Sequence, residues 1–259
     1  MPSLALELWR EACQAILSLV YADACALCHA DGGGGLDQVL CDRCAAALPR
    51  LDGPRCAVCG EWFLGVTPGP FRCLNCADRT FAFEFATAPY RARAGVLELI
   101  HQFKYQRQLW LAPLLGRLLA EGIAGPQADP RLADEDWVLV PVPLHARRLR
   151  EREFNQAWEL ASVAGRLAGL PLVNALRRVR HTSVQASLAR QNRLENLRHA
   201  FQLRRSWSGL RRTTSPVLGK AVLLVDDVFT TGATADACAR VLLRDGRARR
   251  VVALTLARG

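Results

Sequence analysis

VLLVDDVFTTGAT, residues 222–234, joins an apolar run to two adjacent carboxylates, Asp226 and Asp227, and then to a turn rich in threonine and glycine. The apolar run predicts a buried strand at 221–227, and residues 231–246 predict a helix after the turn. In parallel α/β sheets, ligands bind beyond the carboxyl ends of the strands. We therefore expect the two acids and the turn to lie together at a binding site.

The chain before and after this stretch alternates between strand and helix patterns. Nearly continuous apolar strands separated by helices are typical of a parallel sheet covered on both faces, so the sequence predicts an α/β fold. The expected strands are 81–90, 137–143, a short one around 172–176, 221–227 and 250–258. The expected helices are 93–105, 109–123, 154–170, one that reaches about Phe201, and 231–246. Residues 125–136 are expected as a surface loop and 204–219 as an exposed linker.

The turn after the two acids has the chemistry of a phosphate site. Its residues are Thr230, Thr231, Gly232, Ala233 and Thr234. Free amides at a helix N-terminus bind phosphate, and a glycine lets the backbone approach the ligand closely. Two acids directly before such a turn suggest a ribose 5-phosphate, whose 2- and 3-hydroxyls they would bond while supporting a nearby Mg²⁺. The alternative is a strand-end aspartate that only caps a helix.

Eight of the ten cysteines form four CxxC pairs. The pairs are Cys25 and Cys28, Cys41 and Cys44, Cys56 and Cys59, and Cys73 and Cys76. Two pairs supply four thiolates to Zn²⁺ and leave no open position, which predicts two structural zinc sites. The natural pairing joins the first pair with the second and the third with the fourth, but the spacing leaves a cross-braced pairing open. A disulfide framework, an iron–sulfur cluster and redox thiols are the alternatives. Cys13 and Cys238 are expected to be ordinary buried thiols.

Basic charge is concentrated in the middle of the chain. The net charge is +10, with 32 Arg and two Lys, yet residues 1–80 carry 6 basic and 9 acidic side chains. Residues 147–212 carry 15 Arg and 4 Glu, a net charge of +11, which favours an anionic ligand there. A high arginine content is also typical of a GC-rich coding sequence, which is the simpler explanation of the total.

The N-terminal segment is predicted to be a helix rather than a signal peptide. Glu7, Arg10 and Glu11 interrupt its apolar run, and no basic segment precedes that run. No stretch of about 18 uncharged apolar residues occurs, so we expect no membrane span. The missing export signal and the thiolate metal sites together favour a cytoplasmic protein.

VLLVDDVFTTGAT closely resembles the phosphoribosyl pyrophosphate (PRPP) signature of type I phosphoribosyltransferases. The resemblance extends to VPVPLHARRLREREFNQAWELA (140–161), to RRVRHTSVQASLARQNRLENLRHAF (177–201) and to the cysteine-rich N-terminus, which together look like the ComF family. Its members are phosphoribosyltransferase-like proteins linked to DNA uptake in natural transformation, usually with an N-terminal zinc ribbon. The match runs from about Cys25 to Arg258. It departs at Glu153, where the family usually has the glycine of R-G-F-N-Q.

The resemblance implies an N-terminal helix at 1–24, a double zinc ribbon at 25–80 and a phosphoribosyltransferase-like domain at 81–259. Asp226 and Asp227 would hold the ribose hydroxyls, and Thr230 through Thr234 would hold the 5-phosphate. Val140, Pro141, Val142 and Pro143 would form a pyrophosphate loop whose sharp turn, with a cis bond as one option, aims amides at an anion. The alternative for these four residues is a strand that simply stops at proline.

Several cations are implied to meet phosphate. They are Lys104 and at least one of Arg147, Arg148, Arg150 and Arg152, with Arg147 and Arg152 as candidates. In related enzymes a mobile loop near 177–201 covers the reacting centre. The residues of interest there are Arg177, Arg178, His181, Thr182, Gln185, Arg190, Arg193 and Asn196. A solvated helix end or an ordinary basic surface is the alternative for each of these residues.

Three functions remain open from the sequence. The first is a phosphoribosyltransferase that uses Mg²⁺ and PRPP and transfers the sugar to an unidentified acceptor with release of pyrophosphate. Thr230 stands where hypoxanthine-type relatives carry an aspartate, which argues against that substrate class. The second is a non-catalytic single-stranded DNA-binding protein that reuses the phosphate site and acts with DNA-uptake proteins. Its basic segment offers few aromatic side chains for stacking. The third and weakest is a zinc redox switch.

Overall fold

The computed structural model describes residues 24–30, 39–133, 135–180, 199–204, 207–208, 211–212 and 215–259. The expected helix near the N-terminus, Cys13 and most of the polar stretch 177–201 lie outside these described residues.

A parallel sheet forms the centre of the described chain. Its strands follow the order β1 (Ala86–Thr87), β9 (Arg250–Arg258), β8 (Ala221–Phe229) and β3 (Trp137–Pro141), and β2 (Tyr90–Arg91) also pairs with β9. Every pairing in this sheet is parallel, and Val225 of β8 lies opposite both Leu254 and Pro141. The α/β class with a parallel sheet, expected from the sequence, is confirmed.

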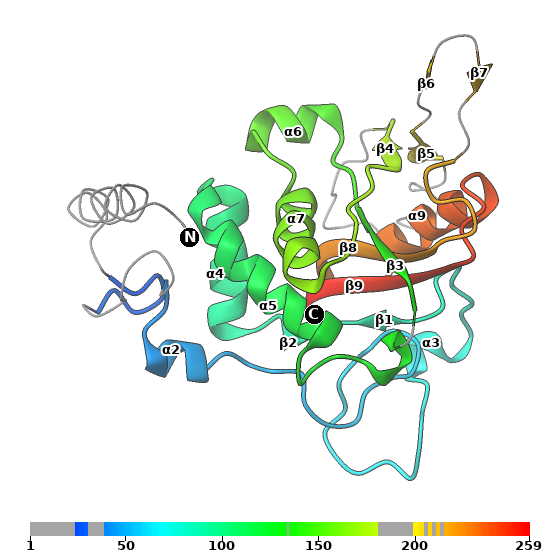
Figure 1. Cartoon of the computed structure of the whole chain (residues 1–259). Coiled ribbons are helices and arrows are strands. Elements are labelled where there is room, and N and C mark those ends of the chain that lie inside the picture. Colours follow the sequence, from blue (N-terminus) through cyan, green and yellow to red (C-terminus); the bar gives the residue numbers. More distant parts are fainter. Residues whose placement is uncertain are drawn as a thin grey trace, which may run out of the picture.

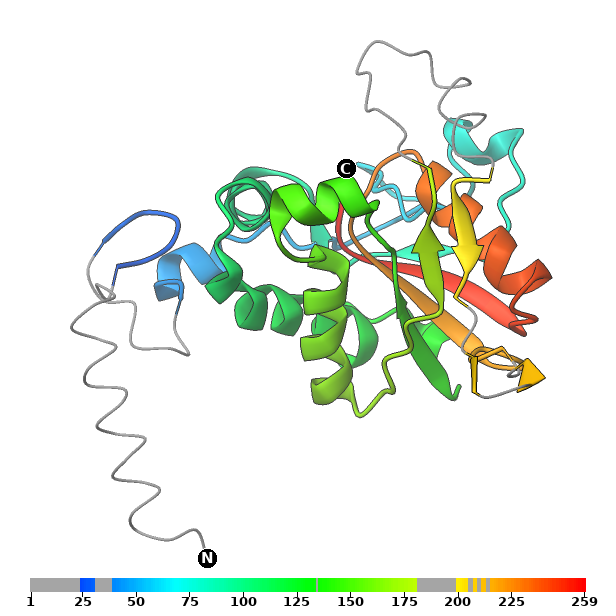
Figure 2. The same cartoon turned by 90° about the horizontal axis from the view of Figure 1, so that it is seen from above.

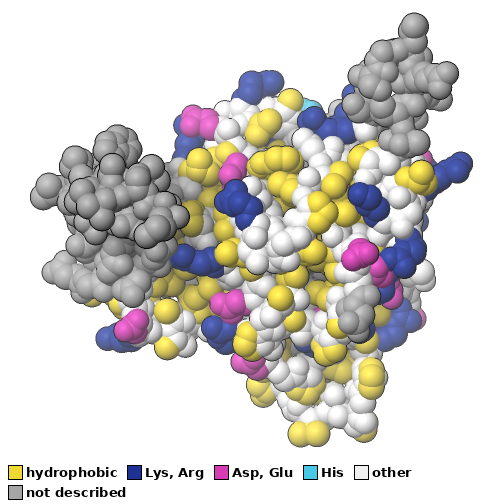
Figure 3. Space-filling view, viewed as in Figure 1, with side chains coloured by type: hydrophobic (Ala, Val, Ile, Leu, Met, Phe, Trp, Pro, Cys, Tyr) yellow, Lys and Arg dark blue, Asp and Glu magenta, His cyan; other side chains and the backbone are white. Residues whose placement is uncertain are grey.

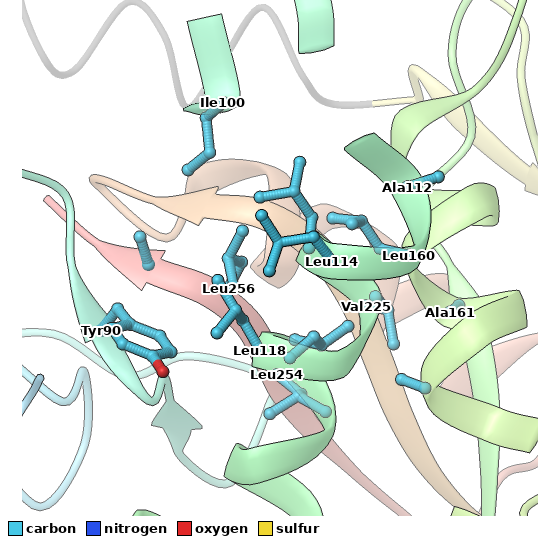
Figure 4. Close-up of a cluster of buried hydrophobic side chains, with 14 of the residues drawn as sticks. Tyr90, Ile100, Ala112, Leu114, Leu118, Leu160, Ala161, Val225, Leu254 and Leu256 are labelled. Carbon is cyan, nitrogen blue, oxygen red and sulfur yellow. The ribbon is translucent and has the colours of Figure 1, made fainter. Parts of the chain in front are cut away.

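Helices cover both faces of the sheet (Figures 1 and 2). On one face lie α5 (Ala112–Ala124) and α7 (Gln156–Ala168), with α4 (Ala94–Tyr105) beside them, and α9 (Ala233–Arg244) covers the other. Side chains alternate along β8, so Val225 joins the first core and Leu224 joins the core under α9. Figure 4 shows Val225 and Leu254 among the leucines of α5 and α7. The same alternation decides where the residues at the end of β8 point.

Two expected elements differ from those observed. The strand expected at 81–90 is observed as two short strands, β1 and β2, and Pro89, which has no N–H to donate, stands between them. The helix expected to reach about Phe201 is wrong at that end, because Phe201 begins β5 (Phe201–Leu203), which pairs antiparallel with β4 (Leu176–Arg178). Phe201 is buried in the core under α9, and strand pairing directs its side chain there.

The remaining elements are short. The expected linker contains β6 (Trp207–Ser208) and β7 (Arg211–Arg212), which pair antiparallel. The others are α2 (Asp42–Ala46), α3 (Leu74–Ala77), η1 (Leu109–Leu111), η2 (Pro130–Leu132) and α6 (Ala146–Arg152). Among the described helices, none has the length and apolar character needed to cross a bilayer.

Candidate functional site

The turn after β8 has a conformation that glycine alone adopts easily. Gly232 precedes α9 as its N-cap with a φ of 77°. A Cβ at this position would lie 2.8 Å from Phe229 Cζ and 3.2 Å from Phe81 Cε1. Behind Gly232 the N–H of Ala233 points to Thr231 Oγ1 at 3.4 Å. Because glycine adopts this left-handed conformation easily, the chain can bend tightly over the rings of Phe229 and Phe81 before α9 begins.

A cavity lies above this turn, between β8, β9 and α9. The side chain of Asp226 and the whole predicted phosphate turn share its wall. Among the residues of this wall are Val142, Asp226, Thr230, Thr231, Gly232, Ala233, Thr234 and Thr255. Thr255 was not predicted, although it is the polar residue within the apolar run 250–258 and lies opposite Asp226 in the strand register.

The two adjacent acids point in different directions. The strand continues through both of them to Phe229, so Asp226 falls on the face of α9 and Asp227 on the face of α4. Asp227 is buried and forms an ion pair with Lys104 of α4. Of the two acids, Asp226 lines the cavity. The structure thus brings Asp226 to the turn and places Asp227 behind it, against Lys104.

Three cations lie around Asp226, and a fourth, Arg148, lies near Lys104. Burial raises the pKa of the Asp226 carboxyl to about 6, and the charges of Lys104, Arg178 and Arg152 oppose that rise. Burial lowers the pKa of Lys104 to about 8; Asp226 opposes this shift, and Arg152 and Arg148 reinforce it. Lys104 therefore remains charged at neutral pH. A site where arginine and lysine outnumber the carboxylates is suited to a ligand with several negative charges.

The cations proposed from the sequence separate into two groups. Lys104 and Arg152 belong to the cluster around Asp226, whereas Arg147 is exposed and pairs with Glu151 one helical turn away at 3.0 Å. Arg148 and Arg178 complete the cluster. Arg178, one of the residues of interest that the sequence singled out in the stretch 177–201, lies on β4 and reaches the cluster from there.

The segment Val140–Pro143 reaches the cavity through Val142. No peptide bond in the described chain is cis, so the turn here is made with trans bonds. The N–H of Val142 donates to the carbonyl oxygen of Val225 at 2.8 Å, which corrects the expectation that this amide points at an anion. Asn155 donates to the carbonyl oxygen of Val142 at 3.1 Å and also caps α7. Asn155 therefore fixes this segment against the helix that follows.

Glu153 occupies the backbone position that the family usually gives to glycine. It ends α6 with a φ of 70°, in the left-handed region that disfavours a side chain. Its carboxylate pairs with Arg107 at 2.5 Å, and Arg107 also donates to the carbonyl oxygen of Glu151. The ion pair joins the end of α6 to the loop after α4. The turn is therefore kept, at the cost of a strained backbone.

The eight paired cysteines gather into two groups. One contains Cys25, Cys28, Cys41 and Cys44, and the other contains Cys56, Cys59, Cys73 and Cys76. Within each group the sulfur atoms lie within 4.8 Å of one another. The separations of 3.7 Å for Cys28–Cys41 and 3.6 Å for Cys59–Cys73 match the edge of a tetrahedron around Zn²⁺ with bonds of about 2.3 Å. The pairing is sequential rather than cross-braced, and both groups are compatible with structural zinc.

The two groups repeat one local design. In each, the N–H of the first cysteine bonds the carbonyl five residues later: Cys25 to Ala30 at 3.0 Å, and Cys56 to Glu61 at 2.8 Å. The residue after each first CxxC pair, His29 or Gly60, has a positive φ. The second CxxC pair of each group begins a short helix, α2 or α3. The chain therefore contains two copies of the same zinc-ribbon turn.

Known proteins are similar to this chain over most of its length. Residues 16–77 match the double zinc ribbon domain. Competence protein F from Haemophilus influenzae (strain ATCC 51907 / DSM 11121 / KW20 / Rd) is 30% identical over 208 residues, which cover 80% of this chain and 85% of that protein. The chain belongs to the competence protein F family. DNA utilization protein YhgH from Escherichia coli (strain K12) is 31% identical over 210 residues, covering 81% of this chain and 86% of that protein.

Solved structures align with just over half of the chain. A structure of the allosteric regulatory enzyme of purine biosynthesis covers 56% of this chain and 25% of its own, at 19% identity and a TM-score of 0.32. Phosphoribosylpyrophosphate synthetase from Mycobacterium smegmatis covers 57% of this chain and 33% of its own, at 23% identity and a TM-score of 0.28. Because both TM-scores are low, the fold is described by its own strand order and not by these two structures.

Proposed function

We propose that this chain binds PRPP, or another ribose 5-phosphate ligand, with Mg²⁺ in the cavity between β8 and α9. The supporting observation is that Asp226 and the N-terminal turn of α9 share one cavity wall beside four cations. The turn Thr230–Thr234 binds the 5-phosphate, and Asp226 accepts hydrogen bonds from the ribose hydroxyls. Lys104, Arg148, Arg152 and Arg178 face the pyrophosphate.

In a transfer reaction, pyrophosphate leaves C1 of the sugar as an acceptor attacks it. Beside Asp226, a Mg²⁺ bound with the ligand would neutralise charge on the leaving pyrophosphate. The protein's own contribution is the fixed cluster of cations, which stabilises the negative charge that grows on the leaving group. Thr230 is exposed at the mouth of the cavity and carries no carboxylate to assist a purine. The acceptor is therefore a class other than hypoxanthine-type purines.

We propose that this activity serves DNA uptake during natural transformation and takes place in the cytoplasm. Membership of the competence protein F family supports the first part of this proposal. The test is calorimetric titration of PRPP into the full-length protein with and without Mg²⁺, for wild type and Asp226→Asn. We expect saturable, magnesium-dependent binding in wild type and at least about 10-fold weaker binding in the variant, the loss of one charge-assisted contact. A pyrophosphate-release assay with bases, amines and single-stranded DNA as acceptors then separates transferase from binder. Equal affinity of the two proteins would refute the proposed site.

A second candidate function is binding of single-stranded DNA. Tyr105 and Trp110 lie outside the basic segment and are 63% and 44% exposed, and Arg152 of that segment lies 5.3 Å from the Tyr105 ring centroid. These aromatic side chains supply stacking partners that the basic segment lacks. On the face shown in Figure 3, however, basic side chains are scattered among acidic and apolar ones. Binding that weakens steeply with salt and is lost in Tyr105→Ala would support this function, and binding that is insensitive to both would reject it.

A further inference from the structure

One buried arginine joins the second cysteine group to the turn after β8. Arg258 Nε donates to the carbonyl oxygen of Cys59 at 2.9 Å, and its Nη2 lies 3.6 Å from Cys59 Sγ. Its Nη1 donates to the carbonyl oxygen of Phe229 at 3.2 Å. Its Nη2 also forms an ion pair with Glu61 at 2.8 Å. A single guanidinium therefore bridges a metal ligand and the last residue of β8.

The turn after β8 packs against the ring of Phe229. Phe229 directly precedes Thr230, and its ring lies so close to Gly232 that a Cβ there would come within 2.8 Å of it. The carbonyl oxygen of Phe229 accepts a second hydrogen bond from the N–H of Gly259 at 2.9 Å. The Arg258 guanidinium also lies 5.2 Å from the centroid of the Phe229 ring. A displacement of Arg258 would thus move the base of the turn.

The charge of the metal group explains why a buried arginine is stable at this position. Four thiolates with one Zn²⁺ carry a net charge of about −2, and Glu61 adds another negative charge. Arg258 is 9% exposed, where an unpaired guanidinium would be strongly unfavourable. Its planar fork reaches Cys59 and Phe229 at once, which a lysine ammonium does not reproduce.

The first cysteine group has no such link in the described chain. There, no arginine or lysine donates to the sulfur of Cys25, Cys28, Cys41 or Cys44. Cys28 is exposed, whereas Cys56, Cys59 and Cys76 of the second group are buried. The two metal groups of one molecule therefore form an internal comparison, one with the arginine bridge and one without it.

We propose that Arg258 is a positioning residue that couples metal binding at the second cysteine group to ligand binding in the β8–α9 cavity. Metal at this group fixes Cys59, Cys59 fixes Arg258, and Arg258 holds the Phe229 carbonyl at the base of the turn. Coupling of this kind is reciprocal in binding free energy, so a ligand in the cavity tightens the binding of metal at the second group. We expect the tighter binding to appear as slower loss of the metal. The effect of a cavity ligand on metal binding rests on the proposed function, whereas the effect of Arg258 on metal binding does not.

The test follows zinc release from the full-length protein to a coloured chelator. Arg258→Met is compared with wild type. Arg250→Met is the matched control, because Arg250 lies at the opposite end of the same strand, β9, where it pairs with Glu84. The same measurements are repeated in proteins that also carry Cys44→Ser, which removes a ligand of the first cysteine group. The zinc release seen in these proteins is then assigned to the second group. We expect release from the second group to be roughly 10-fold faster in Arg258→Met and unchanged in Arg250→Met, in line with losses of outer-shell partners elsewhere. Equal rates in wild type and Arg258→Met would overturn the proposal.

A second variant and a measurement with ligand distinguish the remaining outcomes. If Arg258→Met fails to fold, Arg258→Lys carries the test: it keeps the charge, and we expect intermediate release, whereas a wild-type rate overturns the proposal. With PRPP and Mg²⁺ as the probe, zinc release slows in wild type and does not slow in Arg258→Met. If PRPP binds by calorimetry without slowing release, the coupling is wrong while the proposed function stands. If PRPP does not bind, the proposed function fails, and the rates without ligand still decide the role of Arg258 at the metal.

Discussion

Lys104 near the end of α4 and Asp227 near the end of β8 form a buried ion pair. Their side chains are 16% and 7% exposed, and Lys104 is one of two lysines in the chain. The pair ties the helix beside α5 to the strand that ends in the candidate site. It also neutralises Asp227, so the charge of Asp226 is the carboxylate charge presented to the cavity.

Breaking this pair is expected to destabilise the fold strongly. We expect Lys104→Met and Asp227→Asn each to lower the free energy of unfolding by about 3 kcal/mol, because each leaves a buried charge unpaired. The double variant should lose less than the sum of the two, by about 1 kcal/mol or more, because the second substitution removes the orphaned charge. Urea denaturation of the four proteins measures this. Strictly additive losses would show that the two side chains do not interact.

The raised pKa of Asp226 predicts a pH-dependent stability. The pKa rises from an ordinary value of about 4 in the unfolded chain to about 6 in the folded one. Between these values the folded state binds more protons, so the stabilising effect of protonation is complete below about pH 4 and is lost as the pH rises through about 6. The uncharged asparagine side chain of the Asp226→Asn variant mimics the protonated carboxyl group of Asp226. We therefore expect Asp226→Asn to match wild type at about pH 4 and to exceed it by about 1 to 2 kcal/mol at pH 8, after allowance for partial exposure. Thermal unfolding across this range checks it, and a difference that is constant with pH would contradict it.

Gly232 is expected to tolerate no side chain. Gly232→Ala adds both a strained φ and a contact of 2.8 Å with Phe229, for a loss of about 2 kcal/mol or more. Gly169→Ala is the matched control, because Gly169 has a φ of 67° and nothing within 4 Å of an added Cβ, so it reports the backbone strain of about 1 kcal/mol alone. The two variants are compared by denaturant midpoint. Equal losses would mean that Phe229 does not confine the turn.

Glu153 offers a substitution that relieves strain. Glu153→Gly removes the side chain from a residue with a φ of 70° but loses the exposed ion pair with Arg107. Left-handed strain of about 1 kcal/mol exceeds a surface ion pair of about 0.5 kcal/mol, so this variant should be as stable as wild type or slightly more stable. Glu153→Ala loses the ion pair and keeps the strain, and should be the least stable of the three. A glycine variant that is less stable than the alanine variant would contradict this account of the turn.

The fold class and the location of the site followed from local patterns. The apolar run before Asp226, the glycine at 232 and the helix pattern after it are short-range signals, and each reappears in β8, the turn and α9. The cysteine spacing likewise predicted metal groups, although it left the pairing open. The structure resolved the pairing because the sulfur atoms of sequential pairs lie together.

The parts that sequence reasoning missed depend on register and on distant contacts. The predicted strand stopped at Asp227, but β8 continues to Phe229, and two neighbouring residues within a strand must face opposite sides. This is why Asp226 and Asp227 separate. Arg258 meets Cys59 across 199 residues of chain. No local pattern marks this arginine as different from the many others in the sequence.

The most direct measurement is a crystal structure of the full-length protein with PRPP and Mg²⁺ bound. The account predicts 5-phosphate oxygens within about 3 Å of backbone N–H groups in the turn Thr230–Thr234, and a ribose hydroxyl within the same distance of an Asp226 oxygen. Asp136, an exposed acid just before β3, should make no contact with the ligand. Density for the ligand away from this turn, or an empty cavity at saturating ligand, would contradict the central claim.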